Sequence, residues 1–165
     1  MPDNTLSQKD IKLTVDYIYE QITKIDRIAT AVVKCHLEVE EQLHKTLEAL
    51  ARSPKYLDLT DYTGFARKMQ WLRAFGPLGD NDYWQLIEAL NNLRNKVAHE
   101  SKGPKRDEAL QELRNQLNRH LKGDECVSDQ NTWKDFNVIM AASVLSIGFL
   151  CEIREQIQKE RLGES

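Results

Sequence analysis

The segment Arg94-Asn95-Lys96-Val97-Ala98-His99 places a guanidinium, an amide and an imidazole at the end of an expected amphipathic helix. These three groups can cleave RNA without a metal: Arg94 offers a planar donor that matches a phosphate, Asn95 offers a hydrogen-bonding amide, and His99 offers a proton carrier that titrates near neutral pH. A basic residue and a histidine in a last helical turn also suit the helix dipole and the unpaired carbonyls there. The segment therefore has both a catalytic and a purely structural interpretation.

The spacing of Arg94 and His99 limits the catalytic interpretation. Residues five apart on a helix differ by about 140° around the axis and about 7.5 Å along it, so the two side chains do not stand side by side. They can share a cleft through the long arginine side chain, through a helix that ends near His99, or through a second subunit across a two-fold axis. Each of these arrangements would let both groups face one phosphate.

A second stretch, Arg114-Asn115-Gln116-Leu117-Asn118-Arg119-His120, repeats the arginine-asparagine start with one more residue before the histidine. Arg94 falls on the apolar stripe of its helix, where an unpaired guanidinium would be costly unless something requires it. Arg114 falls on a polar helix, where charge costs little. We therefore expect the chemistry at Arg94, and a solvated face at Arg114.

A long helix earlier in the chain carries His36, Glu40 and His44, which are spaced one turn apart. His36 falls in the middle of the apolar stripe and Glu40 inside its edge. The three could ligate a metal, but the sequence offers no second His/Glu pair of the right spacing to complete such a site, so we expect no bound metal. The remaining alternatives are a buried His36 bonded to Glu40 or to another helix, and His36 or Glu40 packed behind Arg94.

Contacts to RNA would need a local basic patch, because the net charge of −3 and the pI near 5.8 give no general attraction to nucleic acid. Lys96 and Lys102 flank the motif, and Trp84, which falls off the apolar stripe, is the candidate stacking platform for a base. Tyr83, on the stripe, is expected in the core. A solvated surface is the alternative for the other basic residues near the motif, which are Arg67, Lys68, Arg73, Lys105 and Arg106.

The composition favours one all-α domain over residues 1–165, with residues 1–7 and 162–165 frayed. The chain is 41% hydrophobic and 30% charged, and only 7 glycines and 4 prolines interrupt it, which favours long helices over a sheet of many short strands. Three widely spaced cysteines argue against a disulfide framework and a thiolate metal site. The polar, acidic start lacks the features of a secretion signal, so we expect a cytoplasmic protein.

Helical periodicity and breakers predict an up-and-down bundle of four to five helices. The apolar middle of the last helix, Val138–Leu150, is shorter than the roughly 20 residues that span a bilayer, so we expect no membrane partner but a central core helix that a second subunit could share. The expected helical ranges are Gln8–Arg52 as one helix or two, Thr63–Phe75, Asp82–Glu100, Arg106–Lys122 and Thr132–Arg161.

The string Leu90-Asn91-Asn92-Leu93-Arg94-Asn95-Lys96-Val97-Ala98-His99-Glu100 resembles the signature of the HEPN superfamily (higher eukaryotes and prokaryotes nucleotide-binding domains). That signature is an arginine, a polar residue, and a histidine four to six residues after the arginine. The order of the predicted helices also resembles the superfamily's bundle over roughly 25–157. The turn Phe75-Gly76-Pro77-Leu78-Gly79-Asp80 is similar to that of bacterial relatives described as mannitol-operon repressor-like.

The resemblance implies a metal-independent endoribonuclease without cofactors, often a toxin or anti-phage effector, with its site at a homodimer interface. Arg94 would bind the scissile phosphate, Asn95 would orient it, and His99 would act as general base or acid for attack by the 2′-hydroxyl. The subfamily whose toxins are controlled by adenylylation has a tyrosine where this chain has Ser101, which argues against control by that route. The superfamily also holds regulators without nuclease activity, so a non-catalytic regulator or protein-interaction module is the alternative, and an antitoxin or regulatory protein is a candidate partner.

Overall fold

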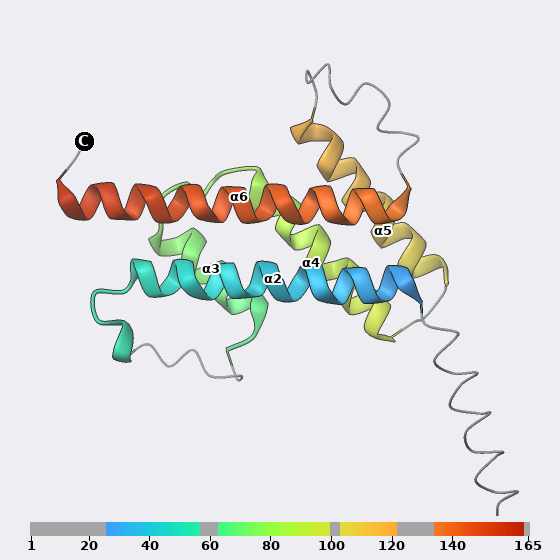
Figure 1. The fold of residues 1–165 in the computed structure, drawn as a ribbon, viewed down its shortest axis with the longest axis horizontal. Coiled ribbons are helices and arrows are strands. Elements are labelled where there is room, and N and C mark those ends of the chain that lie inside the picture. Colours follow the sequence, from blue (N-terminus) through green and yellow to red (C-terminus); the bar gives the residue numbers. More distant parts are fainter. Residues whose placement is uncertain (1–25, 57–62, 100–102, 122–133, 164–165) are drawn as a thin grey trace, which may run out of the picture.

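The computed structural model describes residues 26–56, 63–99, 103–121 and 134–163, which form an all-α bundle (Figure 1). Within these residues the predicted fold class is confirmed. Most helix bounds agree with the sequence to within two or three residues, and Pro104, expected to lie before its helix, is the first residue of α5. The expected helix before Asp26 lies outside the described residues. The elements are α2 (Arg27–Leu50), a short 3-10 turn (Pro54–Tyr56), α3 (Phe65–Phe75), α4 (Tyr83–His99), α5 (Pro104–His120) and α6 (Asp135–Leu162).

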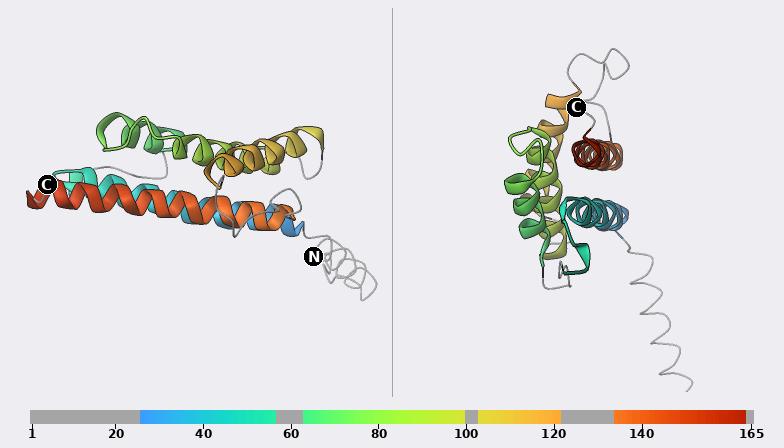
Figure 2. Two further views of the ribbon diagram at one scale, coloured as in Figure 1. Left: turned by 90° about the horizontal axis from the view of Figure 1, so that it is seen from above. Right: turned by 90° about the vertical axis from the view of Figure 1, so that its left-hand side faces the viewer.

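The helices form two layers: α2 and α6 lie side by side in one, and α3, α4 and α5 cover one face of that pair (Figure 2). The two long helices run in the same direction, since contacts join Cys35 to Met140 near their starts, and Arg161 to the carbonyl of Ala51 near their ends. Thr46 lies against Leu150 between these points. The opposite face of the α2/α6 pair bears exposed apolar side chains on α6, including Met140 and Val144.

Asp26 fixes the start of α2 and ties it to α5. Its side chain accepts hydrogen bonds from the backbone amides of Ile28 and Ala29, which would otherwise lack partners in the first helical turn. Arg106, buried on α5, forms an ion pair with the same carboxylate. The hydrogen bond from Arg106 is the main cause that holds the pKa of Asp26 below its usual value.

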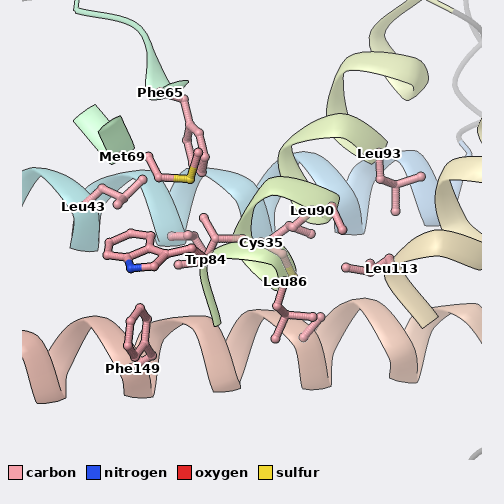
Figure 3. Packing of buried hydrophobic residues seen from close by; sticks show 14 of the residues in the cluster. Cys35, Leu43, Phe65, Met69, Trp84, Leu86, Leu90, Leu93, Leu113 and Phe149 are labelled. Atoms are coloured by element: carbon pink, nitrogen blue, oxygen red, sulfur yellow. The ribbon is translucent and has the colours of Figure 1, made fainter. Parts of the chain in front are cut away.

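The core lies between the layers (Figure 3). Trp84 is its largest fully buried side chain, and its ring meets Phe149 of α6 edge to face at 5.1 Å. α6 buries one side from Val138 to Ile157, and its buried Ser143 and Ser146 donate to the carbonyls four residues earlier. By length and composition α6 is also apolar enough to cross a membrane, a test that core helices of soluble proteins pass as well.

The turn between α3 and α4 aligns the helix that carries the motif. A Cβ on Gly79 would collide with the carbonyl oxygen of Arg73, and Leu78 has a positive φ of 61°, so the backbone here is unusually tight. The indole nitrogen of Trp84 donates to the Leu78 carbonyl at 2.8 Å. Asn81 caps the first turn of α4 by accepting from the amide of Tyr83.

Candidate functional site

A polar pocket of about 610 Å³ opens between α2, α3 and α4. It combines the polar residues predicted on the first long helix with part of the predicted catalytic motif. The residues that line it are His36 and Glu40 from α2, Gly64 just before α3, Phe65, Ala66 and Arg67 from α3, and Asn91, Arg94 and Asn95 from α4.

Arg94 and Asn95 lie on the exposed rim of this pocket. The Arg94 Nη1 donates to Asn95 Oδ1 at 3.3 Å, so the two side chains form one polar unit. The prediction that Arg94 is held on a buried stripe is wrong, because its long side chain reaches the pocket mouth, where the guanidinium stays in contact with water. An exposed guanidinium here is available to an anion.

His36 forms the inner wall of the pocket, as its place on the apolar stripe predicted. The residue is 4% exposed, and its ring stacks on Phe65 with centroids 4.5 Å apart and places Nε2 3.0 Å from Asn91 Oδ1. Burial is the main cause that lowers its pKa, the Arg94 charge acts in the same direction, and Asn91 and Glu40 oppose both. The imidazole is therefore neutral at pH 7. The sequence left open whether His36 bonds to Glu40, bonds to another helix, or packs behind Arg94. In the structure His36 contacts Asn91 of another helix, α4, and lies behind Arg94 in the pocket.

Glu40 lies beside His36 and has a partner that the sequence did not suggest. Lys68 of α3, 7% exposed, places its Nζ 3.0 Å from Glu40 Oε1. The pair neutralises both charges in a partly buried place, where either alone would be costly. His44, the third member of the possible metal trio, pairs with Glu48 instead, at 3.4 Å. The described residues contain no cluster of three potential metal ligands.

His99 does not line the pocket. It is the last residue of α4 and is exposed, while Arg94, more than one turn earlier, faces the pocket. Within one protomer the structure therefore brings Arg94 and Asn95 together with His36 and Glu40, and it does not bring His99 to them. The expected separation around the helix axis accounts for this result.

The predicted RNA-binding residues are placed differently. Trp84 is 1% exposed, so the prediction that it offers a free ring face to a base is wrong. Trp84 lies near the start of α4, where α6 and the turn after α3 pack against the helix. The residue is therefore buried although it lies off the apolar stripe of α4. Tyr83 is half-buried between His120 and Phe149. Lys96 is half-buried in the last turn of α4, and Lys102 lies outside the described residues.

The basic patch around the motif is smaller than the sequence suggested. Lys68 is bound to Glu40, Arg73 to Glu88 and Arg106 to Asp26. Among the described residues, Arg67 and Arg94 are the pocket-lining cations, and neither forms an ion pair within that part of the chain. The pocket is consequently cationic although the whole chain is acidic.

The second arginine-histidine stretch serves to join helices. Arg114 pairs with Asp135 at the start of α6, and His120 stacks on Tyr83 with centroids 4.0 Å apart. Burial lowers the pKa of His120. The expectation of a solvated face is wrong for Arg114 and His120, because these side chains contact α6 and α4.

Comparison with known proteins gives no assignment: no protein-family model, curated protein or solved structure matches the chain.

Proposed function

We propose that the chain is a metal-independent endoribonuclease of the HEPN type, acting as a homodimer. The observation that carries the proposal is Arg94, exposed at the rim of a cationic pocket and bonded to Asn95, with neutral His36 and the Glu40–Lys68 pair behind it. A site of this kind offers donors and positive charge to a phosphodiester, and the HEPN resemblance gives Arg94, Asn95 and His99 their roles.

The chemistry follows from those groups. The 2′-hydroxyl of the substrate attacks the adjacent phosphorus and the 5′-oxygen leaves, which gives a 2′,3′-cyclic phosphate. His99 takes the hydroxyl proton or gives one to the leaving oxygen. Negative charge grows on the phosphoryl oxygens, and the Arg94 guanidinium stabilises it, while Asn95 orients the phosphate. No metal takes part in these steps.

A second subunit would complete the site, because His99 lies outside the pocket of its own protomer. Val33 and Leu37, 39% and 57% exposed, adjoin His36 and Glu40 on the surface of α2 by helical spacing. Two exposed apolar side chains beside a polar pocket suit a contact with a second copy, which would bring the partner's His99 to Arg94. Lys96 and Lys102 would then guide RNA to the site.

The separation of Arg94 and His99 within one protomer also favours a second candidate, a non-catalytic regulator that binds an anionic ligand or a partner protein. In that case the pocket would bind without cleaving. A toxin or anti-phage role under the first candidate, and an antitoxin or regulatory protein as partner, remain part of the proposal and follow from the resemblance.

The experiment is RNA cleavage by the purified full chain in excess EDTA. We expect wild-type protein to release products with 2′,3′-cyclic phosphate ends, and Arg94→Ala and His99→Ala to lose activity by at least about 100-fold. Arg114→Ala, in the second arginine-histidine stretch, is the matched control and should stay active. Intact RNA with the wild type, or full activity in His99→Ala, would overturn the nuclease assignment.

A further inference from the structure

The contact between His36 and Asn91 sets which atoms the pocket presents. His36 is neutral and nearly inaccessible, and Phe65 holds its ring plane by stacking. A neutral imidazole has one N–H donor and one acceptor nitrogen. The structure places Nε2 3.0 Å from Asn91 Oδ1, an oxygen that can only accept, so in this arrangement Nε2 is the nitrogen that carries the proton.

In this bond the Asn91 amide is turned with its oxygen toward His36. With Oδ1 accepting from His36, the Asn91 Nδ2 group is left to donate, and Asn91 lies one turn before Arg94 on the same side of α4. The Asn95 oxygen is engaged in the same way, since it accepts from Arg94. Glu40 Oε1 accepts from Lys68. An oxygen of Asn91, of Asn95 and of Glu40 thus accepts a hydrogen bond from another protein group. The side-chain N–H groups of the two asparagines and the guanidinium of Arg94 remain to donate to a ligand.

We propose that Asn91 is an anion-binding residue of this pocket and that His36 is the positioning residue that orients its amide, so that Asn91 and Arg94 together hold one phosphate group. The identification of that phosphate as an RNA phosphodiester rests on the proposed function. The alternative role for the same contact is to fasten α2 to α4, with no part in ligand binding.

The test is binding of a fluorescent 2′-O-methyl RNA oligonucleotide, which cannot be cleaved by 2′-hydroxyl attack, with inorganic phosphate as competitor. We expect Asn91→Ala and His36→Phe each to weaken binding about 10-fold, as loss of one hydrogen bond to a charged group does. The double variant should be no weaker than Asn91→Ala alone, because His36 acts through Asn91. Asn92→Ala, on an exposed position beside the pocket residue, and His44→Phe are the matched controls and should bind as the wild type does.

A helix-fastening role predicts a different pattern. His36→Phe would then lower the melting temperature while folded protein still binds with wild-type affinity, or the effects of His36→Phe and Asn91→Ala on affinity would multiply. Either outcome overturns the proposal. If Arg94→Ala leaves RNA binding unchanged, both the anion site and the proposed function are wrong. If the Arg94, Asn91 and His36 variants weaken RNA binding but the wild type does not cleave RNA, only the nuclease assignment is wrong.

Asn91→Asp supplies a second test if His36→Phe fails to fold. The carboxylate keeps the size of the amide but removes its donor, so binding should fall more than 10-fold. The substitution should also raise the pKa of His36, measured by NMR titration, because it adds a negative charge beside the ring. The charges that already face the ring are the carboxylate of Glu40 on α2, which is bound to Lys68 of α3, and the opposing guanidinium of Arg94 on α4. Wild-type affinity in Asn91→Asp would contradict the assignment of a donor at this position.

Discussion

The ammonium group of Lys68 lies 3.0 Å from Glu40 Oε1, so the carboxylate in the wall of the pocket is neutralised by a buried lysine rather than by Arg94. This pairing keeps the guanidinium of Arg94 available to a ligand. Without Lys68, Glu40 would compete with a phosphate for the same guanidinium.

Lys68→Met should therefore weaken binding of the 2′-O-methyl oligonucleotide by about 10-fold, or about 1.4 kcal/mol. Adding Glu40→Gln should restore most of the lost affinity, since it removes the freed charge. Arg73→Met, which breaks the exposed pair with Glu88 away from the pocket, is the control. If Lys68→Met binds as tightly as the wild type, Glu40 does not affect Arg94.

Two substitutions distinguish the faces through which the chain can dimerise. Leu37→Glu places a charge beside the pocket on α2, and Val144→Glu places one on the outer side of α6. A dimer that completes the site with the partner's His99 predicts that Leu37→Glu becomes monomeric and loses at least about 100-fold in cleavage, while Val144→Glu keeps both properties. Analytical ultracentrifugation with cleavage assays decides this. Dissociation caused only by Val144→Glu would instead indicate a scaffold that pairs through its last helix.

The free energy of unfolding should depend on pH through the protonation of His36. Its pKa is lowered in the folded protein, so the unfolded chain binds the proton more readily, and folding loses free energy as the pH falls below the unfolded value of about 6.5. Urea midpoints should fall between pH 7.5 and pH 5, and fall less in His36→Phe. His120, whose pKa is also lowered, contributes in the same direction. An equal slope in His36→Phe and wild type would show that burial of His36 does not control the effect.

Asp26→Ala should be among the most destabilising changes on the surface of α2. It removes the cap of the helix and leaves buried Arg106 without this carboxylate, at a cost of about 2 to 4 kcal/mol in urea unfolding. Asp135→Ala, which removes a half-exposed partner of Arg114, should cost about 1 kcal/mol or less. Similar losses in the two variants would contradict the special role of Asp26.

Periodicity and breakers predicted most of the described helices, but they did not predict that α2 begins at Arg27, inside the expected range Gln8–Arg52. Ser53-Pro54 and Gly76-Pro77 follow the ends of α2 and α3 closely. The buried position of His36 was also predictable, since it lies in the middle of its helix's apolar stripe.

The site was only partly predictable, because helix crossing decides which faces meet. Asn91, Lys68 and Phe65 come from three positions with no shared motif, and only the packing of α3 and α4 on α2 brings them to His36 and Glu40. Trp84 was misplaced for the same reason: the stripe of one helix does not show where a second neighbour covers it. A buried lysine gives no signal in a single sequence that separates it from a solvated one.

Mixing inactive variants tests whether Arg94 of one subunit and His99 of the other act on one phosphate. When Arg94→Ala and His99→Ala proteins are mixed, unfolded together and refolded, half of the dimers carry both variants and each of these has one intact site. Shared action of the two subunits predicts recovery of about a quarter of wild-type RNA cleavage in EDTA. A mixture that stays as inactive as the separate variants, while the wild type cleaves, would contradict it.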